Sequence, residues 1–231
     1  MFNALVLNQE DKRTIASIEQ IDETQLPEGD VLIDVDYSSL NYKDGLAITG
    51  KGKIIRNFPM VPGIDLAGTV VSSEDDRYQA GDKVVLTGWG VGENHWGGMS
   101  QRARLKADWL VPLPKGLDSK KAMMVGTAGF TGMLCVQALL DAGIKPENGE
   151  ILVTGASGGV GSVAVTLLAQ LGYKVAAVTG RVDKNGPLLE KLGASRIIDR
   201  VEFEEPARPL EKQVWAGCLL YTSDAADDTR S

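Results

Sequence analysis

Hydrophobic and polar positions divide the chain into two parts with different periodicities. Up to about residue 115, short apolar or alternating runs separated by Gly, Pro and Asp predict β-strands. These runs cover residues 4–7, 31–37, 68–71, 83–86 and 109–111. Their spacing predicts a partly closed β-barrel. Two segments with helical spacing follow, one from Ser119 and one from Thr127 to Ala142, so we place the domain boundary at about residue 120.

A β-α-β unit is predicted in the second part. Apolar strands at 151–153 and 175–178 flank an amphipathic run that ends at Leu171. A short helix at 187–192, opened by proline, and a third strand at 196–199 complete half of a doubly wound parallel sheet. No further strand is expected. The predicted fold class is therefore α/β, with a partly open β-barrel followed by a truncated Rossmann sheet.

The turn after the first of these strands has the composition of a dinucleotide site. It reads G-A-S-G-G-V-G from residue 155. A pyrophosphate binds at a helix N-terminus, where backbone N–H groups are unpaired, and a Cβ would hold the backbone away from it. Gly158 and Gly159 remove that obstacle, and Gly161 lets the helix lie close to the strand. The pattern A-x-G-x-x-G between two strands therefore predicts a nucleotide-binding Rossmann unit.

The end of the second strand bears on the choice of nucleotide. NAD-dependent enzymes place a carboxylate there for the ribose 2′-OH, whereas an arginine suits a 2′-phosphate. This strand ends in Thr179-Gly180-Arg181, and no carboxylate follows before Asp183. NADPH is therefore the predicted cofactor, and the alternative is that Arg181 is only a solvated loop charge.

Composition narrows the class of protein further. The 231 residues are 43% hydrophobic and carry a net charge of −7, which disfavours nucleic acid and anionic membranes as partners. Two cysteines form neither a disulfide framework nor a metal cluster. With no leader and no apolar run of about 18 residues, we expect a cytoplasmic protein without membrane segments.

Five longer motifs point to one family. They are N-Y-K-D at 41–44, I-T-G-K-G-K-I-I-R at 48–56, P-G-I-D at 62–65, L-T-G-W-G-V-G-E-N-H-W-G-G at 86–98 and V-G-T-A-G-F-T at 125–131. Together they resemble acrylyl-CoA reductases, the quinone-oxidoreductase-like branch of the medium-chain dehydrogenase/reductase superfamily. The resemblance implies a GroES-like domain at 1–120, the first half of a Rossmann NADPH-binding domain at 121–217, and a cleft between them.

The same resemblance implies hydride addition to the β-carbon of acrylyl-CoA, giving propionyl-CoA, by a homodimer. Carried onto this sequence, the family's NADP contacts fall on Tyr42, Ser157, Gly158, Gly159, Val160, Thr179, Gly180, Arg181 and Arg200. A quinone or enone oxidoreductase is the alternative enzyme. A non-catalytic NADPH-binding protein is the alternative from another class.

Zinc-dependent relatives use Cys, His and either Glu or Cys at the catalytic site, and four closely spaced Cys in a structural lobe. Here Asn41 and Asp65 stand in the corresponding catalytic motifs, and there is no cysteine cluster. The sequence therefore predicts no metal site. His95, the only histidine, is expected to be a loop or hydrogen-bonding residue.

Without a metal, hydrogen-bond donors must stabilise the enolate that forms from an enoyl thioester. Tyr42 is the first candidate, either as proton donor or as a residue that only packs against the nicotinamide. Asn41 is the second, to orient Tyr42 or to donate, and Lys43 can help electrostatically. Water is the other possible proton source.

For two further segments the sequence leaves two interpretations open, and for a third we expect a structural role. The cations of 51–56 either meet ligand phosphates or belong to a solvated loop. The loop 88–98 is either a mobile wall over the substrate or a packed surface loop. Apolar residues at helical spacing, Phe130, Met133 and Leu134, are expected in the core.

The last residues leave the family's pattern. From Cys218 to Ser231 the chain resembles translated adapter sequence, so we expect a non-native tail that takes no part in function. We also expect a truncated chain to be poorly active or inactive.

Overall fold

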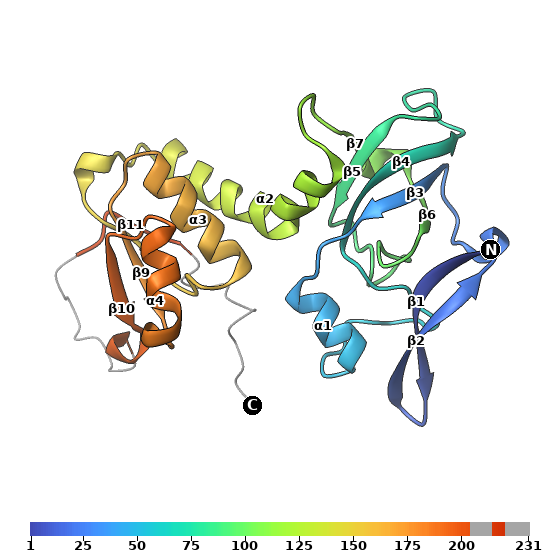
Figure 1. The fold of residues 1–231 in the computed structure, drawn as a ribbon, viewed down its shortest axis with the longest axis horizontal. Coiled ribbons are helices and arrows are strands. Elements are labelled where there is room, and N and C mark those ends of the chain that lie inside the picture. The colour runs from blue at the N-terminus through green and yellow to red at the C-terminus, as the bar shows by residue number, and fades with distance from the viewer. Residues whose placement is uncertain (204–213, 220–231) are drawn as a thin grey trace. The chain divides into compact units, whose positions relative to one another are not determined.

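The computed structural model describes residues 1–203 and 214–219. Its chain forms two compact units, Met1–Thr127 and Ala128–Ser231 (Figure 1). Four short 3₁₀ turns lie among the described elements, at Glu23–Gln25, Ala107–Trp109, Pro146–Asn148 and Arg200–Phe203.

The first unit is built on an antiparallel sheet with the strand order β6-β3-β4-β5-β7. Its strands are β3 (Val31–Tyr37), β4 (Asp65–Ser73), β5 (Lys83–Thr87), β6 (Arg102–Leu105) and β7 (Val111–Pro112). One face is apolar and packs inward, as an antiparallel sheet of this kind requires. Its buried core includes Val31, Ile33, Leu66, Val84, Leu86 and Leu105. The predicted β-rich first domain is confirmed.

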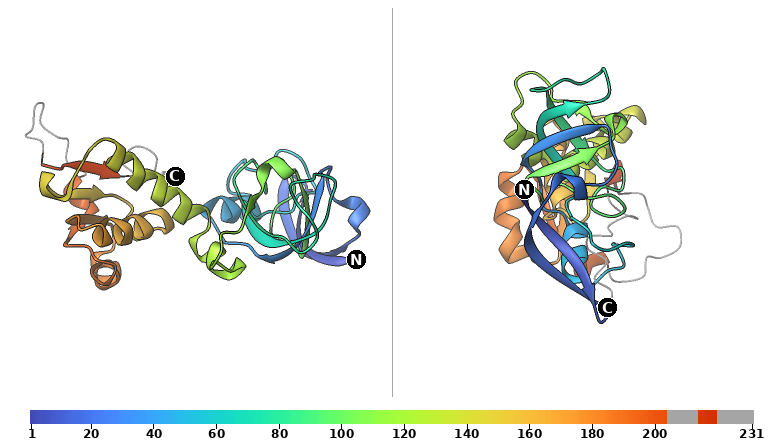
Figure 2. Two further views of the ribbon diagram at one scale, coloured as in Figure 1. Left: turned by 90° about the horizontal axis from the view of Figure 1, so that it is seen from above. Right: turned by 90° about the vertical axis from the view of Figure 1, so that its right-hand side faces the viewer.

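A long hairpin of β1 (Phe2–Glu10) and β2 (Arg13–Ile21) extends beyond this sheet (Figures 1 and 2). Its two turn residues, Asp11 and Lys12, both have positive φ, as the tight turn of such a hairpin requires. Three buried residues of β1 pack against Leu32 of β3 and against Val61. The residues of β1 are Phe2, Ala4 and Val6. The hairpin is thereby fixed to the sheet.

The sequence prediction missed β2, β6 and the helix α1 (Tyr42–Thr49). In β2 only Ile21 is buried, so the strand lacks a clear apolar alternation. In α1, Gly45 lies in the middle and only Asp44 and Ala47 are buried. These elements form because β1, β3 and the loops beside them supply the partners, not because their own sequences specify them.

The helix α2 (Ser119–Asp141) is interrupted at Gly126, whose φ of 54° and ψ of −166° are not helical. In the described part of the chain it is the one helix long and apolar enough, by length and composition alone, to cross a membrane. The expectation that no such run occurs was therefore wrong. The break at Gly126 leaves two shorter helices, neither of which reaches the about 20 residues that a membrane span needs.

The second unit contains a parallel sheet with the strand order β10-β9-β8-β11. Its strands are β8 (Ile151–Val153), β9 (Val175–Thr179), β10 (Arg196–Asp199) and β11 (Gly217–Leu219). The helices α3 (Gly159–Gln170) and α4 (Val182–Lys191) connect β8 to β9 and β9 to β10, and they lie in front of the sheet in Figure 1. The predicted Rossmann topology is confirmed.

Each face of this sheet has its own apolar cluster. One face contributes Ile151, Val153, Val175 and Ala177 to a core shared with α2, α3 and α4. The other face carries Leu152, Ala176, Val178 and Ile198, with Trp215 packed against them. A parallel sheet that is buried on both faces has strands that are apolar throughout, which is why the runs at 151–153 and 175–178 were recognisable in the sequence.

One predicted boundary was wrong. Helix α4 begins at Val182 rather than at Pro187, because Arg181 already accepts the first helical hydrogen bond, from Asn185 N–H at 2.9 Å. Pro187 then lies in the second turn, where its missing N–H costs one hydrogen bond.

A fourth strand also exists where none was expected. In β11, Cys218 and Leu219 pair in parallel with Leu152 and Val153 of β8. Leu219 is buried in the same core as Ile151 and Val153, so Cys218 and Leu219 are part of the sheet. The adapter-like residues after 219 lie outside the described residues.

Candidate functional site

The strand order places the glycine-rich turn at a reversal in the sheet. From β8 the chain moves outward to β9 and β10 on one side, whereas β11 lies on the other side. In open α/β sheets, ligands bind at the carboxyl ends of the strands where the order reverses in this way. The turn at 154–158 follows β8 and lies at this position.

Helix α3 offers unpaired donors at its first turn. Its first hydrogen bond runs from Ser162 N–H to Gly158 O at 2.9 Å. The three N–H groups before it, of Gly159, Val160 and Gly161, therefore have no acceptor inside the helix. Ser157, Gly158 and Gly159 are exposed. Unpaired N–H groups and the positive end of the helix dipole together suit a phosphate.

Packing explains two of the glycines here. A Cβ at Gly161 would lie 2.3 Å from Gly155 O and 2.7 Å from the Cα of Ala156, so only glycine allows this close approach of helix and turn. A Cβ at Gly159 would lie 3.1 Å from the Cβ of Ala128. The role predicted for Gly161 agrees with this geometry.

The end of β9 gathers the other predicted cofactor residues. Thr179 is buried, and its Oγ1 accepts hydrogen bonds from Asn185 Nδ2 at 3.1 Å and from Arg181 N–H at 3.4 Å. It also lies 3.4 Å from Ser157 Oγ, which links the end of β9 to the turn. Asn185 was not among the predicted residues, because its contact depends on α4 beginning at Val182.

Arg200 lies beside this segment. Asp199, the last residue of β10, pairs with Thr179, so the residue that follows it, Arg200, lies next to Gly180. A Cβ at Gly180 would be only 3.3 Å from the Arg200 Cζ, so the guanidinium group packs on this glycine. Arg181 and Arg200 are both exposed, and neither forms an ion pair with an acid among residues 1–203 and 214–219. Two guanidinium groups at the end of β9 can therefore hold an anion bidentately.

A separate cluster of polar groups lies in the first unit, where β3 ends and β4 begins. Asp65 is fully buried, and its carboxylate accepts five hydrogen bonds. The donors are Ser39 N–H and Oγ, Asn41 Nδ2, and Thr127 N–H and Oγ1, at distances between 2.6 and 3.3 Å. We call Ser39, Asn41, Asp65 and Thr127 the Asp65 cluster. Sequence analysis missed Ser39 and Thr127 as members of it.

The donor role predicted for Asn41 is wrong for its side chain. Its Nδ2 donates to Ser39 Oγ at 3.0 Å and to Asp65 Oδ2 at 3.3 Å. An amide nitrogen carries two hydrogens, so both are used. Asn41 therefore cannot donate to a thioester oxygen from this position.

Tyr42 follows directly as the first residue of α1. It is 45% exposed, and its hydroxyl has no protein partner among the described residues. Ser39, Asn41 and Thr127 all donate to Asp65, so Tyr42 is the neighbouring side chain whose O–H remains available. Lys43 is paired with Glu93 at 3.1 Å, which neutralises part of its charge.

A second buried carboxylate supports the start of α1. Asp44 accepts hydrogen bonds from the N–H groups of Asn41, Gly63 and Ile64 at 2.8 to 3.1 Å. Burial nevertheless raises the pKa of Asp44 above its ordinary value. These bonds tie the start of α1 to the segment before β4.

The loop 88–98 is packed rather than open. Gly97 N–H donates to Val61 O at 2.7 Å, and a Cβ at Gly92, Gly97 or Gly98 would collide with the backbone of residues 62–65. His95 Nε2 lies 2.7 Å from Arg104 O, so it carries the hydrogen, and burial lowers the pKa of His95. The hydrogen-bonding role expected for His95 is confirmed.

Two other predicted segments are exposed. Lys51, Lys53 and Arg56 form no ion pair with the described acids, so the choice between a phosphate contact and a solvated loop stays open. Phe130, Met133 and Leu134 are 51%, 41% and 53% exposed, so the prediction that they lie in the core was wrong. Helical spacing gave the right element but not the buried face.

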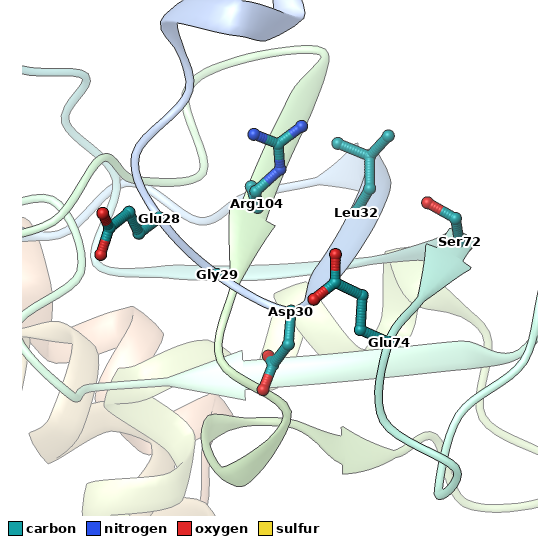
Figure 3. A pocket seen from close by; sticks show the side chains of 7 residues that line it. All are labelled: Glu28, Gly29, Asp30, Leu32, Ser72, Glu74 and Arg104. Carbon is teal, nitrogen blue, oxygen red and sulfur yellow. The ribbon is translucent and has the colours of Figure 1, made fainter.

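A cavity of about 400 Å³ lies at the opposite end of the first sheet (Figure 3). It is lined by Glu28, Gly29, Asp30, Leu32, Ser72, Glu74 and Arg104, which surround the start of β3 and the end of β4. The carboxylates of Glu28 and Asp30 point away from the Arg104 guanidinium in Figure 3. Tyr42 and Asp65 belong to the other end of these strands, so this cavity is separate from the Asp65 cluster. Within the described ranges, no three His, Cys, Asp or Glu side chains are grouped to hold a metal ion.

Known proteins with similar sequences identify the family of this chain. Residues 27–115 match the alcohol dehydrogenase GroES-like domain. A protein of Escherichia coli K12 named "Probable acrylyl-CoA reductase AcuI" is 66% identical over 221 residues, which cover 96% of this chain and 68% of that protein. The chain belongs to the AcuI/YhdH family of acrylyl-CoA reductases. The acrylyl-CoA reductase AcuI of Ruegeria pomeroyi is 58% identical. That alignment covers 95% of this chain and 67% of the relative.

A solved structure of the same family shows the same fold. The YhdH oxidoreductase of Salmonella enterica in complex with NADP is 66% identical, with a TM-score of 0.91. The alignment covers 94% of this chain and 66% of that one. The chain therefore spans about two thirds of the length of the family members it matches.

Proposed function

We propose that the protein is a zinc-free, NADPH-dependent reductase that adds hydride to the β-carbon of acrylyl-CoA, giving propionyl-CoA. One observation carries the cofactor assignment: N–H groups at the start of α3 and two guanidinium groups at the end of β9 lie close together, and none of them is paired with the described residues. This pair of features suits a dinucleotide with an additional 2′-phosphate. Membership of the AcuI/YhdH family supports the substrate.

The residues present fit the cofactor. The N–H groups of 159–161 would hold the pyrophosphate, with no Cβ at Gly158 or Gly159 in the way. Thr179 and Ser157 would supply hydroxyls, and Arg181 and Arg200 would hold the 2′-phosphate. When bound, NADPH supplies the hydride. The chain's own task is then to hold both ligands and to stabilise the negative charge that develops on the thioester oxygen.

Tyr42 performs that second task in this proposal. Its hydroxyl is free in the described structure, and it donates to the thioester oxygen as the enolate forms. A proton then adds to the α-carbon, from Tyr42 or from water, which completes the reduction. In this proposal the Tyr42 hydroxyl polarises the carbonyl in place of zinc. Asp65, which stands in a motif that corresponds to the zinc site of other relatives, uses its carboxylate to accept five hydrogen bonds.

The proposal also includes where the protein is located in the cell and how many subunits it has. We place the protein in the cytoplasm as a homodimer; the free state of Cys135 and Cys218 supports a reducing compartment. Light scattering after size-exclusion chromatography tests the dimer, and a monomer mass at micromolar concentration would contradict it.

The experiment compares acceptors under NADPH. Initial rates are measured for the 231-residue chain and for the same chain extended with the part of the E. coli relative beyond the matched segment. We expect the extended protein to have a higher kcat/KM for acrylyl-CoA than for a benzoquinone. Equal or better kcat/KM on the quinone would favour a quinone or enone reductase. Tight NADPH binding without turnover of either acceptor would favour a non-catalytic NADPH-binding protein.

A further inference from the structure

Trp89 stands at a turn position that its side chain disfavours. Gly88 O accepts a hydrogen bond from Val91 N–H at 3.2 Å, which closes a four-residue turn. Both central residues of this turn have positive φ, 59° at Trp89 and 72° at Gly90. Turns with two positive φ values are dominated by Gly, Asn and Asp, and a bulky side chain in that conformation is an outlier. Strained residues of this kind cluster at ligand sites, so the side chain of Trp89 calls for a functional explanation.

The Trp89 indole is stacked on one side and open to solvent on the other. Its ring lies 6.4 Å from the ring of Trp109, centroid to centroid, at an interplanar angle of 17°. Trp109 packs against the core of the first sheet and meets the edge of the His95 ring at 5.1 Å, so it is held in place. Trp89 itself remains 62% exposed. We call Trp89 and Trp109 the tryptophan stack, and it presents a flat aromatic face at a fixed position.

A free cation lies beside the tryptophan stack. Lys106 Nζ is 5.4 Å from the centroid of the Trp109 ring, which is within the range of a cation–π contact. Lys106 forms no ion pair with an acid among residues 1–203 and 214–219. The acid close to it in sequence, Asp108, is already paired with Arg77 at 2.6 Å. An aromatic face with an unpaired ammonium group beside it suits a planar base that carries phosphate.

The loop that carries Trp89 also reaches the start of α1. Thr87, the last residue before this loop, pairs with Asp65 across β4 and β5. Glu93, within the loop, pairs with Lys43, the second residue of α1, at 3.1 Å. All of these residues belong to the first unit. The tryptophan stack is therefore part of the same unit as Tyr42 and is connected to it through the loop.

We propose that the tryptophan stack and Lys106 bind the adenine nucleotide of the CoA thioester, with adenine on the open face of Trp89 and a phosphate beside Lys106. The inference rests on the proposed function, in which Tyr42 meets the thioester end of the same molecule. Adenine is the one planar ring of a CoA thioester, and phosphates are attached to its ribose. A benzoquinone is planar but has no phosphate for Lys106, and NADPH is assigned to the second unit.

Two ligands and four variants test this assignment. Propionyl-CoA carries the adenine nucleotide, whereas propionyl-pantetheine has the same thioester end without it. Trp89→Asn removes the ring and supplies a residue that this turn favours, and Trp89→Tyr keeps an aromatic face. Lys106→Met removes the charge at similar length. Lys12→Met is the matched control, because it removes one lysine charge at the turn of the β1–β2 hairpin.

Calorimetry on the 231-residue chain measures the dissociation constants. We expect the unsubstituted chain to bind propionyl-CoA more tightly than propionyl-pantetheine. Trp89→Asn weakens propionyl-CoA about five- to 150-fold, the range for loss of one base–aromatic stack, and leaves propionyl-pantetheine and NADPH unchanged. Trp89→Tyr retains propionyl-CoA binding to within about threefold. Lys106→Met weakens propionyl-CoA about two- to fivefold at low salt and less at high salt, and Lys12→Met changes no constant.

The comparison of the two thioesters is the readout that a merely structural role would not give. Equal losses for propionyl-CoA and propionyl-pantetheine in Trp89→Asn overturn the inference, because the indole would then act through the loop beside Tyr42. Unchanged constants in Trp89→Asn overturn it as well, as does an unsubstituted chain that binds the two thioesters equally. A chain that binds NADPH but neither thioester contradicts the proposed substrate instead, so the two failures are distinguished.

Discussion

Replacing two glycines of the second unit by alanine tests the packing of the phosphate turn. Gly161 lies in the first turn of α3, and Gly186 lies in the middle of α4. In an isolated helix, either change to alanine stabilises by about 1 kcal/mol. The two sites differ in what the new Cβ would meet.

At Gly161 the new Cβ would lie 2.3 Å from the Gly155 oxygen and 2.7 Å from the Ala156 Cα. Overpacking costs about 1 to 3 kcal/mol, and because both obstructing atoms belong to the backbone, the upper value of about 3 applies. Subtracting the helical gain of about 1 leaves a loss of about 2 kcal/mol in the free energy of unfolding. At Gly186 nothing other than its chain neighbours lies within 4 Å, but a Cβ on the residue before Pro187 crowds the proline ring, so this offsets part of the helical gain and we expect a change of less than about 1 kcal/mol.

Urea unfolding followed by circular dichroism measures both free energies, and calorimetry measures NADPH binding. We expect Gly161→Ala to weaken NADPH binding as well, because the turn must open and the N–H groups of 159–161 change direction. Gly186→Ala leaves NADPH binding unchanged. If Gly161→Ala is as stable as Gly186→Ala, the packing of the turn is not what requires glycine at 161, since only the first variant places a Cβ against the backbone of residues 155 and 156.

Three other predictions concern the cofactor, pH and the reaction. Arg181→Ala and Arg200→Ala each weaken NADPH about tenfold by calorimetry and leave NADH unchanged, since each removes one charge-assisted contact to the 2′-phosphate; equal losses for both nucleotides would argue against that contact. Burial lowers the pKa of His95 below 6.5, so the folded state binds fewer protons than the unfolded state. The free energy of unfolding of the protein should therefore fall as pH drops below 6.5. The slope should be shallower in His95→Gln, and an unchanged slope would count against a lowered pKa of His95. Tyr42→Phe lowers kcat about 100-fold with an unchanged dissociation constant for NADPH, whereas an unchanged kcat would mean that Tyr42 only packs against the cofactor.

Local sequence specified the dinucleotide half of the site. The two strands, the turn and the helix between 151 and 178 are consecutive, and their apolar runs are unbroken because both faces of the sheet are covered. The positions of Gly158 and Gly161 follow from contacts within the same turn, with Gly155 and Ala156. A pattern made by neighbouring residues can be read without knowing the fold.

The Asp65 cluster could not be predicted in the same way. Its members lie at 39, 41, 65 and 127, and they meet because β3 and β4 are antiparallel and the chain bends at Gly126. The motifs at 41–44 and 62–65 drew attention to Asn41 and Asp65 but not to the hydrogen bonds between them. Which atoms donate depends on that geometry, so the sequence supported a donor role that the structure excludes for the Asn41 side chain.

Strand β11 was missed for a related reason. Its last two residues fall in the segment that resembles adapter sequence, and its partner β8 lies more than 60 residues earlier in the chain. The exposed residues of α2 show the converse error, because a correct helical spacing does not say which face finds a partner.

In the proposed function, NADPH binds with its diphosphate on the N–H groups at the start of α3 and with its 2′-phosphate at the end of β9. Titration of the ¹⁵N-labelled chain with NADPH, followed by amide chemical shifts, locates both phosphates on the protein. We expect the amides of residues 157–161 and of Arg181 to shift most and to saturate together, and we expect NADH to move the first group but not Arg181. Saturable NADPH binding that leaves the amides of 157–161 unmoved would contradict it.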